Sequence, residues 1–291
     1  MLVRKRSKAL SLQLPKVAFG SKPADGGNLI VEPAEHAAVV ADPIAAKYLR
    51  EFRQGREVVR GLDRWCLWMA DEDFEPNDLR RSPILTRRVE ACRAMRENSK
   101  KAATRKSAST PYLFQENHQS LVPYVGIPRV VSETRTFYTA QHLPEAVIAG
   151  DQLFTADDPD GFLFGVISSS MFITWQRAVG GQLKSDLRFS NTLVWNNLPL
   201  PTVDPELREK VIEAGKGVIA ARELHPERSL AEHYNPLAMS PALLKAHAAL
   251  DRVVDKAFGA KKPLHSNEER LALLFERYAE MTAAENEGSR W

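Results

Sequence analysis

Residues 183–201 read LKSDLRFSNTLVWNNLPLP, and they separate two parts of the chain that are built differently. Four apolar side chains recur there at close to alternate positions: Leu187, Phe189, Leu193 and Trp195. Because successive side chains of a β-strand point to opposite faces, this spacing predicts a strand with one polar face, whose register is open at Asn191. Prolines at 199 and 201 end the strand and predict a domain boundary after residue 202.

The segment after these prolines has the pattern of helices throughout. Three places carry the signature of a helix N-terminus: Ser229 with Glu232, Ser240 before Pro241, and Ser266 with Glu269. The helix that begins at Ser240 is expected to end near Gly259 and carries His247 on its apolar face. A packed or capping histidine is the better interpretation there than a metal ligand. Residues 203–291 are therefore predicted to form an all-α domain.

The segment before the boundary mixes strands and helices. Residues 162–179, FLFGVISSSMFITWQRAV, are too apolar for a surface element and predict one buried helix that ends at Gly180-Gly181. Serine followed by proline at 82–83 predicts the start of a helix that runs to about residue 104. Strands are predicted at 64–70, around 121–131, 135–139 and 146–154. The fold class is therefore α+β, a mixed strand and helix domain followed by an all-α domain.

Composition indicates a globular protein. The chain has 291 residues, with 44% apolar and 26% charged residues, which is room for about two domains. No apolar run reaches the roughly 18 residues of a membrane span. The basic residues 1–18 lack the apolar core of a secretion signal, so a charged leader is expected. Cys66 and Cys92 belong to no CxxC pair, which favours reduced core residues in a cytoplasmic protein.

Positive charge is concentrated in one segment. Ten basic and two acidic residues lie between positions 79 and 106, a local excess of +8 in a chain whose total is +3. Such an asymmetry is typical of a nucleic-acid contact. Phosphate contacts, which position a protein on DNA without specifying sequence, are predicted for Arg87, Arg88, Lys100, Lys101 and Arg105. A solvated helix face is the alternative.

The patterns of several catalytic sites are absent. Asn235-Pro236-Leu237-Ala238 is the nearest match to the Asn-Pro-Pro-aromatic loop of an adenine-N6 methyltransferase, and it lacks the second proline and the stacking aromatic. No glutamate is followed two positions later by lysine, as a magnesium nuclease of the PD…ExK type requires. Ser168-Ser169-Ser170 has no GxSxG elbow, so small-residue packing explains it. No complete active site is predicted in this chain.

Six stretches, in this order, resemble the C-terminal part of the MmeI-like (Type IIL) restriction-modification enzymes. They are FGSKPADGGNL (19–29), DRWCLWM (63–69), IPRVVSETR (127–135), FGVISSSMFITW (164–175), the stretch at 183–201, and YNPLAMSPALLKAHAALDRVVDKAFG (234–259). In that family one polypeptide joins a nuclease domain, a helical spacer, an S-adenosylmethionine-dependent adenine methyltransferase, a target recognition domain and a C-terminal helical domain. The resemblance covers only the last two.

The resemblance implies a division of the chain and a set of partners. Residues 1–18 are expected to be a leader or a remnant that links to a methyltransferase domain, 19–202 the DNA target recognition domain, and 203–291 the C-terminal helical domain. The implied partners are double-stranded DNA and methyltransferase and nuclease domains encoded upstream or in a partner chain. S-adenosylmethionine and Mg²⁺ are expected in the full-length enzyme, and no cofactor in this chain.

The implied function is sequence-specific DNA recognition for a restriction-modification adenine-N6 methyltransferase, without a catalytic group in this chain. A helical protein-interaction module that does not touch DNA is the alternative. It would follow if the basic cluster at 80–106 bound an acidic protein instead.

The resemblance also implies where bases are read. In the family, the turn before the corresponding strand carries a variable pair of polar residues two positions apart, here Lys184 and Asp186, followed by Arg188. Lysine can donate to guanine O6 and N7, and aspartate can accept from cytosine N4. Residues i and i+2 of a strand face one side, so the pair is expected to read one G·C pair, with Arg188 on a neighbouring base or a phosphate. A surface salt bridge within the pair is the alternative. Arg129 and Arg135 are expected either to face DNA or to form ordinary ion pairs.

Overall fold

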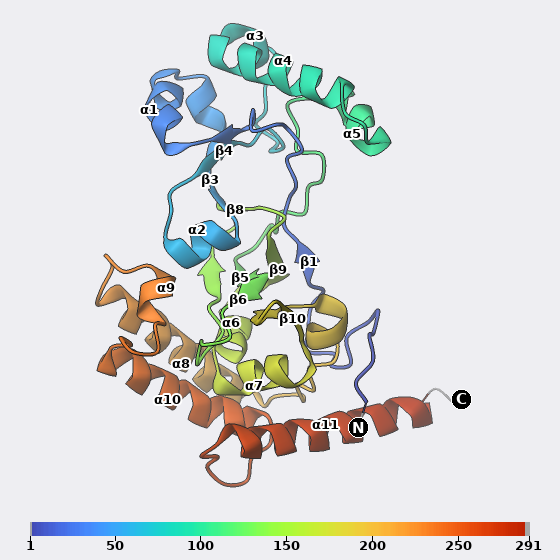
Figure 1. Ribbon diagram of the computed structural model, residues 1–291, viewed down its shortest axis with the longest axis vertical. Coiled ribbons are helices and arrows are strands. Elements are labelled where there is room, and N and C mark those ends of the chain that lie inside the picture. The colour runs from blue at the N-terminus through green and yellow to red at the C-terminus, as the bar shows by residue number, and fades with distance from the viewer. Residues whose placement is uncertain (1, 289–291) are drawn as a thin grey trace. The chain divides into compact units, whose positions relative to one another are not determined.

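The computed structural model describes residues 2–288 and the side chains as far as residue 285 (Figure 1). Met1, which begins the predicted leader, lies outside the described residues. Residues 289–291, which end the predicted C-terminal domain, also lie outside them. The chain forms two compact units. Unit 1 contains residues 1–18, 122–143 and 155–291, and unit 2 contains residues 19–121 and 144–154.

Unit 2 is built on a four-stranded sheet in the order β2-β4-β3-β8. Its strands are β2 (Ile30–Val31), β4 (Trp65–Leu67), β3 (Leu49–Arg53) and β8 (Ile148–Ala149). β4 is antiparallel to both of its neighbours, whereas β3 and β8 are parallel. β4 lies within the strand predicted at 64–70 and confirms it. The short helices of this unit are α1 (Pro33–Ala41), η1 (Ala45–Tyr48), α2 (Gly55–Arg60) and α3 (Asp78–Arg81).

Both cysteines lie in the core of unit 2. Cys66 and Cys92 are free thiols among packed aliphatic and aromatic side chains such as Phe52 and Trp68. Burial raises the pKa of the Cys92 thiol to about 11, and it raises the pKa of Cys66 further still. The prediction that both are reduced core residues is confirmed, because neither thiol has a cysteine partner or thiolate character.

The basic segment is helical, but it is not one long helix. Helix α4 (Pro83–Glu97) begins as predicted, with the Ser82 hydroxyl accepting from the Leu85 amide and proline at the first position. It ends at Glu97 rather than near 104, because the Asn98 backbone and side-chain amides both bind the Ala94 carbonyl. Two short elements follow, α5 (Ala102–Lys106) and η2 (Ser107–Ser109).

Two further sheets contain strands from the residue ranges of unit 1. One has the order β1-β9-β5-β7, from β1 (Ala18–Phe19), β9 (Leu153–Asp157), β5 (Tyr124–Pro128) and β7 (Gln141–Leu143). The other has the order β10-β11-β6, from β10 (Gly181–Leu183), β11 (Asp186–Arg188) and β6 (Val130–Val131). The strands predicted around 121–131 and 146–154 are confirmed. The strand predicted at 135–139 is wrong, because Phe137 and Tyr138 are buried by their side chains rather than paired in a ladder.

The apolar stretch at 162–179 is buried as predicted, but it forms two helices. These are α6 (Phe162–Ile167) and α7 (Ser170–Val179). The break falls at the serines, because the Ser169 hydroxyl accepts from the Phe172 amide and caps α7. Ser170 donates its hydroxyl to the Asp251 carboxylate at 2.6 Å, so these serines make specific hydrogen bonds besides packing closely.

The strand predicted through residue 195 is only partly present. β11 stops at Arg188, and a π-helical turn, η3 (Asn191–Trp195), follows it. The Ser190 hydroxyl accepts from the Leu193 amide, a helix cap that alternation of apolar residues does not indicate. The N-terminal segment runs along this turn, where Leu10 donates to the Asn196 carbonyl and the Trp195 indole donates to the Pro15 carbonyl.

The regular secondary structure described after residue 203 is helical, as predicted. The helices are α8 (Pro205–Glu223), α9 (Leu230–His233), α10 (Pro241–Ala257) and α11 (Asn267–Gly288). The predicted capping box at Ser229 is confirmed, and Ser266 and Glu269 exchange the same pair of bonds. α8 packs on α6 and α10, and α11 packs on α7 (Figure 1). The fold class is α+β, and no helix in the described residues is long and apolar enough to cross a membrane.

Candidate nucleic-acid interface

The residues expected to read bases lie on a β-hairpin. β10 and β11 are antiparallel, with Leu183 opposite Asp186, so Lys184 and Ser185 form a two-residue turn. Lys184 has φ of +57° and Ser185 does not lie in the left-handed region, the combination found in a type II′ turn. Glycine is usual at the first position of that turn, because a side chain there costs roughly 1–2 kcal/mol. Lys184 is thus held in a strained position at the hairpin tip.

This geometry corrects the expected side-chain directions. Lys184 lies in the turn, so the rule that residues i and i+2 of a strand share a face does not apply to Lys184 and Asp186. The pair that shares a face within β11 is Asp186 and Arg188, because Leu187 between them is buried on the other face. Arg188 is exposed and Asp186 is half-buried.

Asp186 makes its recorded contact with the neighbouring loop rather than with Lys184. Its Oδ1 accepts from the Glu133 amide at 3.4 Å, a long hydrogen bond. Among the described residues, we find no ion pair between Lys184 and Asp186, which was the alternative to base reading. The ammonium group of Lys184 is exposed at the tip.

Arg129 and Arg135 flank β6, the strand next to β11. The Arg129 carbonyl accepts from the Phe189 amide at 3.0 Å, which extends the pairing of β6 with β11. Arg129 is half-buried. The Arg135 guanidinium donates to the Ala231 carbonyl of α9 at 2.8 Å, so it is at least partly engaged within the protein.

Sequence reasoning missed the first strand of the hairpin. Gln182 and Leu183 of β10 are exposed, and Leu183 keeps 51% of its surface open beside Asp186. The tip sequence Lys184-Ser185 lacks the Asn-Gly or Asp-Gly pair that marks most two-residue hairpins. The glycines at 180 and 181 are the remaining signal, and the sequence pattern indicates them only as the end of the preceding helix.

Most of the cations expected to hold phosphates are exposed in unit 2. Arg87 projects from α4, and Lys100 and Lys101 lie between α4 and α5. Within the described residues, their side chains form no ion pair. Arg105 is also exposed, although one nitrogen donates to the Ser99 and Lys100 carbonyls. The hairpin and this basic segment belong to different compact units.

Arg88 is a correction to that set. It is 6% exposed and donates to the carbonyls of Asn28 and Ile30 and to the Glu35 carboxylate. Arg88 lies on the buried side of α4, next to the buried Val89. Its guanidinium therefore donates to backbone carbonyls inside unit 2 and is not exposed to a phosphate. Arg96 is also buried, at 0% exposure. The local excess of +8 therefore overstates the charge at the surface.

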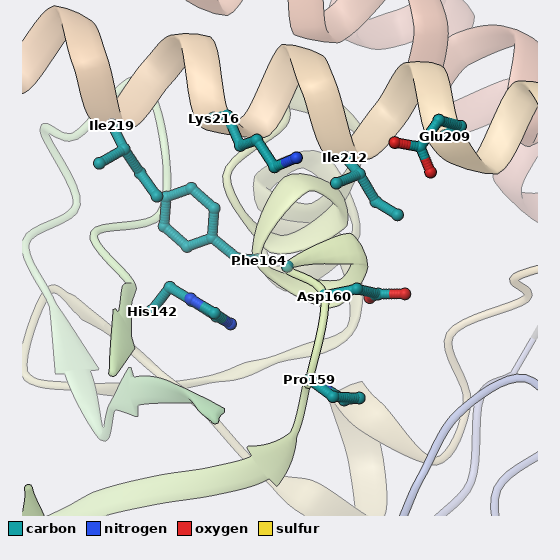
Figure 2. A pocket seen from close by; sticks show the side chains of 9 residues that line it. His142, Pro159, Asp160, Phe164, Glu209, Ile212, Lys216 and Ile219 are labelled. Atoms are coloured by element: carbon teal, nitrogen blue, oxygen red, sulfur yellow. The ribbon is translucent and has the colours of Figure 1, made fainter. Parts of the chain in front are cut away.

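Unit 1 contains a recess at the surface. It has a volume of about 420 Å³ and lies between α8 and the start of α6. Figure 2 shows His142, Asp160 and Phe164 on one side, with four residues of α8 opposite them: Glu209, Ile212, Lys216 and Ile219. Asp160 is paired with Arg208, and Lys216 with Glu213. Because Asp160 and Lys216 are paired within the chain and the lining contains no serine, threonine or cysteine, the recess does not assemble a nucleophile with a base.

The buried carboxylate beside this recess has a structural role. Asp158 accepts from the Leu163 and Phe164 amides at 2.9 and 2.8 Å and so caps α6. Burial raises the pKa of Asp158, even though both amide donors and the nearby His142 favour its charged form. Its oxygens face the helix N-terminus, which accounts for this group without a catalytic role.

The nearest match to a methyltransferase loop is a turn between helices, as predicted. Ala238 donates to the Asn235 carbonyl at 2.9 Å, and the Asn235 side chain accepts from the Leu237 amide. Leu237 is exposed where the catalytic loop would carry its second proline. Among the described residues, no group of three or more His, Cys, Asp or Glu side chains is arranged to hold a metal ion.

The β10–β11 hairpin thus presents exposed polar and charged side chains from a small sheet. The family model for the MmeI target recognition domain matches residues 1–202. The model for the MmeI C-terminal domain matches residues 203–284. The chain therefore belongs to the MmeI family, which confirms the resemblance seen in the sequence.

Two relatives extend the match to almost the whole chain. DNA methyltransferase A of Bacillus subtilis (strain 168) is 34% identical over 284 residues, which cover 97% of this chain and 32% of that protein. The solved structure of the Type IIL restriction-modification enzyme MmeI in complex with DNA superposes with a TM-score of 0.87 at 34% identity. That likeness covers 97% of this chain and 37% of the other. The chain thus spans about a third of the length of these relatives.

Proposed function

We propose that this chain is the DNA recognition module of a restriction-modification DNA methyltransferase. The observation that carries the proposal is the β10–β11 hairpin, which exposes Lys184 and Arg188 beside Asp186 within the segment that matches a target recognition domain. Support comes from the solved relative, a restriction-modification enzyme in complex with DNA.

The hairpin offers the groups that base reading needs. A two-stranded ribbon fits the major groove, where guanine presents acceptors and cytosine presents an amino donor. In the proposed contact, the Lys184 ammonium at the tip donates to guanine and the Asp186 carboxylate accepts from the paired cytosine. Arg188, on the same face as Asp186, reaches a neighbouring base or a phosphate.

Phosphate contacts would hold the module in register. We assign them to Arg87, Lys100, Lys101 and Arg105, which are exposed. Arg129 and Arg135 stay candidates for contacts beside the hairpin, although the Arg135 guanidinium already donates to the Ala231 carbonyl. These contacts add affinity that falls with salt and carry no sequence information.

Chemistry in the complete enzyme is assigned to other domains. We infer that a methyltransferase domain, encoded upstream or in a partner chain, transfers the methyl group of S-adenosylmethionine to adenine N6, and that a nuclease domain binds Mg²⁺. The described residues of this chain do not fit a metal ion, since no suitable group of ligands is assembled. Such an enzyme would work in the cytoplasm, where reduced Cys66 and Cys92 are expected.

The test is a binding-site selection on the Lys184→Glu, Asp186→Arg double variant. We expect the preferred base pair to change at one position of the selected site, because donor and acceptor are exchanged. The matched control exchanges another exposed pair, Lys210→Glu with Glu206→Arg on α8, and should leave every position unchanged. Identical preferences in the hairpin variant and the wild type would show that the assignment is wrong. Failure of the wild-type chain to bind any DNA duplex, even at low salt, would favour the protein-interaction alternative.

A further inference from the structure

The C-terminal end of α7 lies against both loops of the proposed reading surface. Gln176 is 0% exposed, and its Nε2 donates to the Arg188 carbonyl at 3.1 Å, on the last residue of β11. The next residue, Arg177, donates from Nη2 to the Glu133 carbonyl at 3.2 Å and to the Arg135 carbonyl at 2.7 Å. Two adjacent side chains therefore bind the hairpin and the turn after β6.

Gly180 makes room for the first of these contacts. A Cβ atom at this position would lie 2.0 Å from Nε2 of Gln176 and 2.4 Å from its carbonyl oxygen. The Gln176 side chain can fold back over the end of α7 only because residue 180 has no side chain. Gly180, which the sequence predicts to end the helix, is thus also a requirement for the bond to β11.

The other side of α7 is fixed to the rest of unit 1. Trp175 is fully buried, and its indole donates to the Val194 carbonyl of η3 at 2.9 Å. The same indole contacts the rings of Phe275 and Tyr278 on α11, with centroids 5.8 Å apart in each pair. Helix α7 therefore connects the C-terminal helices to strand β11, which carries Asp186 and Arg188, and to the turn that carries Arg135.

We propose that Gln176 and Arg177 are positioning residues that fix β11 and the turn at 132–135 relative to each other. They act through backbone carbonyls, so they set where the base-reading side chains stand without touching DNA themselves. A buried support of this kind matters because a base contact depends on placement to within about 0.5 Å. The C-terminal helices, through α11 and α7, then brace the reading surface. This inference rests on the proposed function.

The test uses three variants of the 291-residue chain, each of which removes a support in a different way. Gln176→Met keeps the volume and loses the donor, Gly180→Ala displaces the amide, and Arg177→Met removes the exposed guanidinium. Each is compared with the wild type in binding-site selection, in competition against random duplex, and in thermal unfolding. The matched controls are Thr174→Val, a buried polar change on the same helix, and Arg252→Met, an exposed arginine on α10 without an ion pair among the described residues.

We expect discrimination at the base pairs read by the hairpin to fall about tenfold in the three variants, with the salt dependence of binding unchanged. The controls should keep wild-type discrimination. The inference would be overturned if the folded Arg177→Met variant kept wild-type discrimination and a folded Gln176→Met or Gly180→Ala variant kept it as well. If Gln176→Met and Gly180→Ala do not fold, Arg177→Met alone decides, because its side chain is exposed. A wild-type chain without any base preference would instead overturn the proposed function, and this inference with it.

Discussion

Leu183 and Asp186 are cross-strand partners on either side of the turn formed by Lys184 and Ser185. The pairing leaves Lys184 at the first position of the turn. Lys184 has a φ of +57° there, a backbone conformation that glycine usually adopts. The proposed base-reading role would account for a strained residue at this exposed tip.

Replacing Lys184 with glycine should separate stability from recognition. We expect the variant to be as stable as the wild type or more stable by roughly 1 kcal/mol, because glycine adopts a positive φ without a steric cost. Discrimination at the guanine position should nevertheless fall by about tenfold or more, since the donor is lost. Urea unfolding and binding competition measure the two effects. A variant that keeps full discrimination would exclude Lys184 as a base-reading residue.

The basic segment can be tested through the salt dependence of DNA binding. Arg87→Ala should lower the slope of log K against log salt concentration by about 1, because one phosphate contact is removed. Arg88→Ala is the matched comparison from the next position of α4, since its guanidinium is buried against backbone carbonyls and Glu35. That variant should lower the free energy of unfolding by about 3 kcal/mol and leave the slope of the folded protein unchanged. The reverse pattern would contradict the corrected assignment.

Arg96 is expected to be essential for the stability of unit 2. Its guanidinium donates to five backbone carbonyls, those of Pro23, Ala24, Ser107, Thr110 and Leu113. Arg96→Lys keeps the charge but cannot reproduce this planar array, so we expect a loss of about 3 kcal/mol in urea unfolding. Arg93→Lys, on the exposed face of the same helix, should change stability by less than about 0.5 kcal/mol. Equal effects in the two variants would refute this role.

Stability should fall in acid because of His247. The ring stacks on Phe137 and binds the Tyr234 hydroxyl, and burial with the nearby Arg222 charge lowers its pKa to about 3. An unfolded histidine titrates near 6.5, so between about pH 6.5 and pH 3 the unfolded chain binds a proton that the folded chain does not. The contribution of His247 is therefore complete above about pH 6.5 and is lost on acidification by roughly 1.4 kcal/mol per pH unit.

The check on this pH dependence is the His247→Gln variant. Glutamine keeps an acceptor for the Tyr234 hydroxyl but has no proton to bind in this range. Urea unfolding at a series of pH values between 4 and 7 should show a shallower decline in the variant than in the wild type. Parallel curves would mean that His247 does not dominate the acid sensitivity.

Local signals made the helical half of the protein predictable. Ser82, Ser229, Ser240 and Ser266 each cap the helix that the sequence indicated, because a cap is a bond between a side chain and a backbone amide two or three residues away. The same local rule, missed at Ser169 and Ser190, explains why the helix expected at 162–179 and the strand expected through residue 195 are interrupted.

The sequence by itself determined the fold class, the family, the burial of residues 162–179 and the helices after residue 203, since these follow from composition, local caps and the order of motifs. Only the tertiary structure decided which arginines reach the surface. Arg88 and Arg96 donate to carbonyls contributed from residues 23–30, which are far away in the sequence, and Arg96 also donates to carbonyls of residues 107–113. It also decided that the turn consists of Lys184 and Ser185 alone, so that Asp186 belongs to β11, and that β11 pairs with β6. Strand pairing and the burial of charge depend on partners distant along the chain, and no local pattern contains those partners.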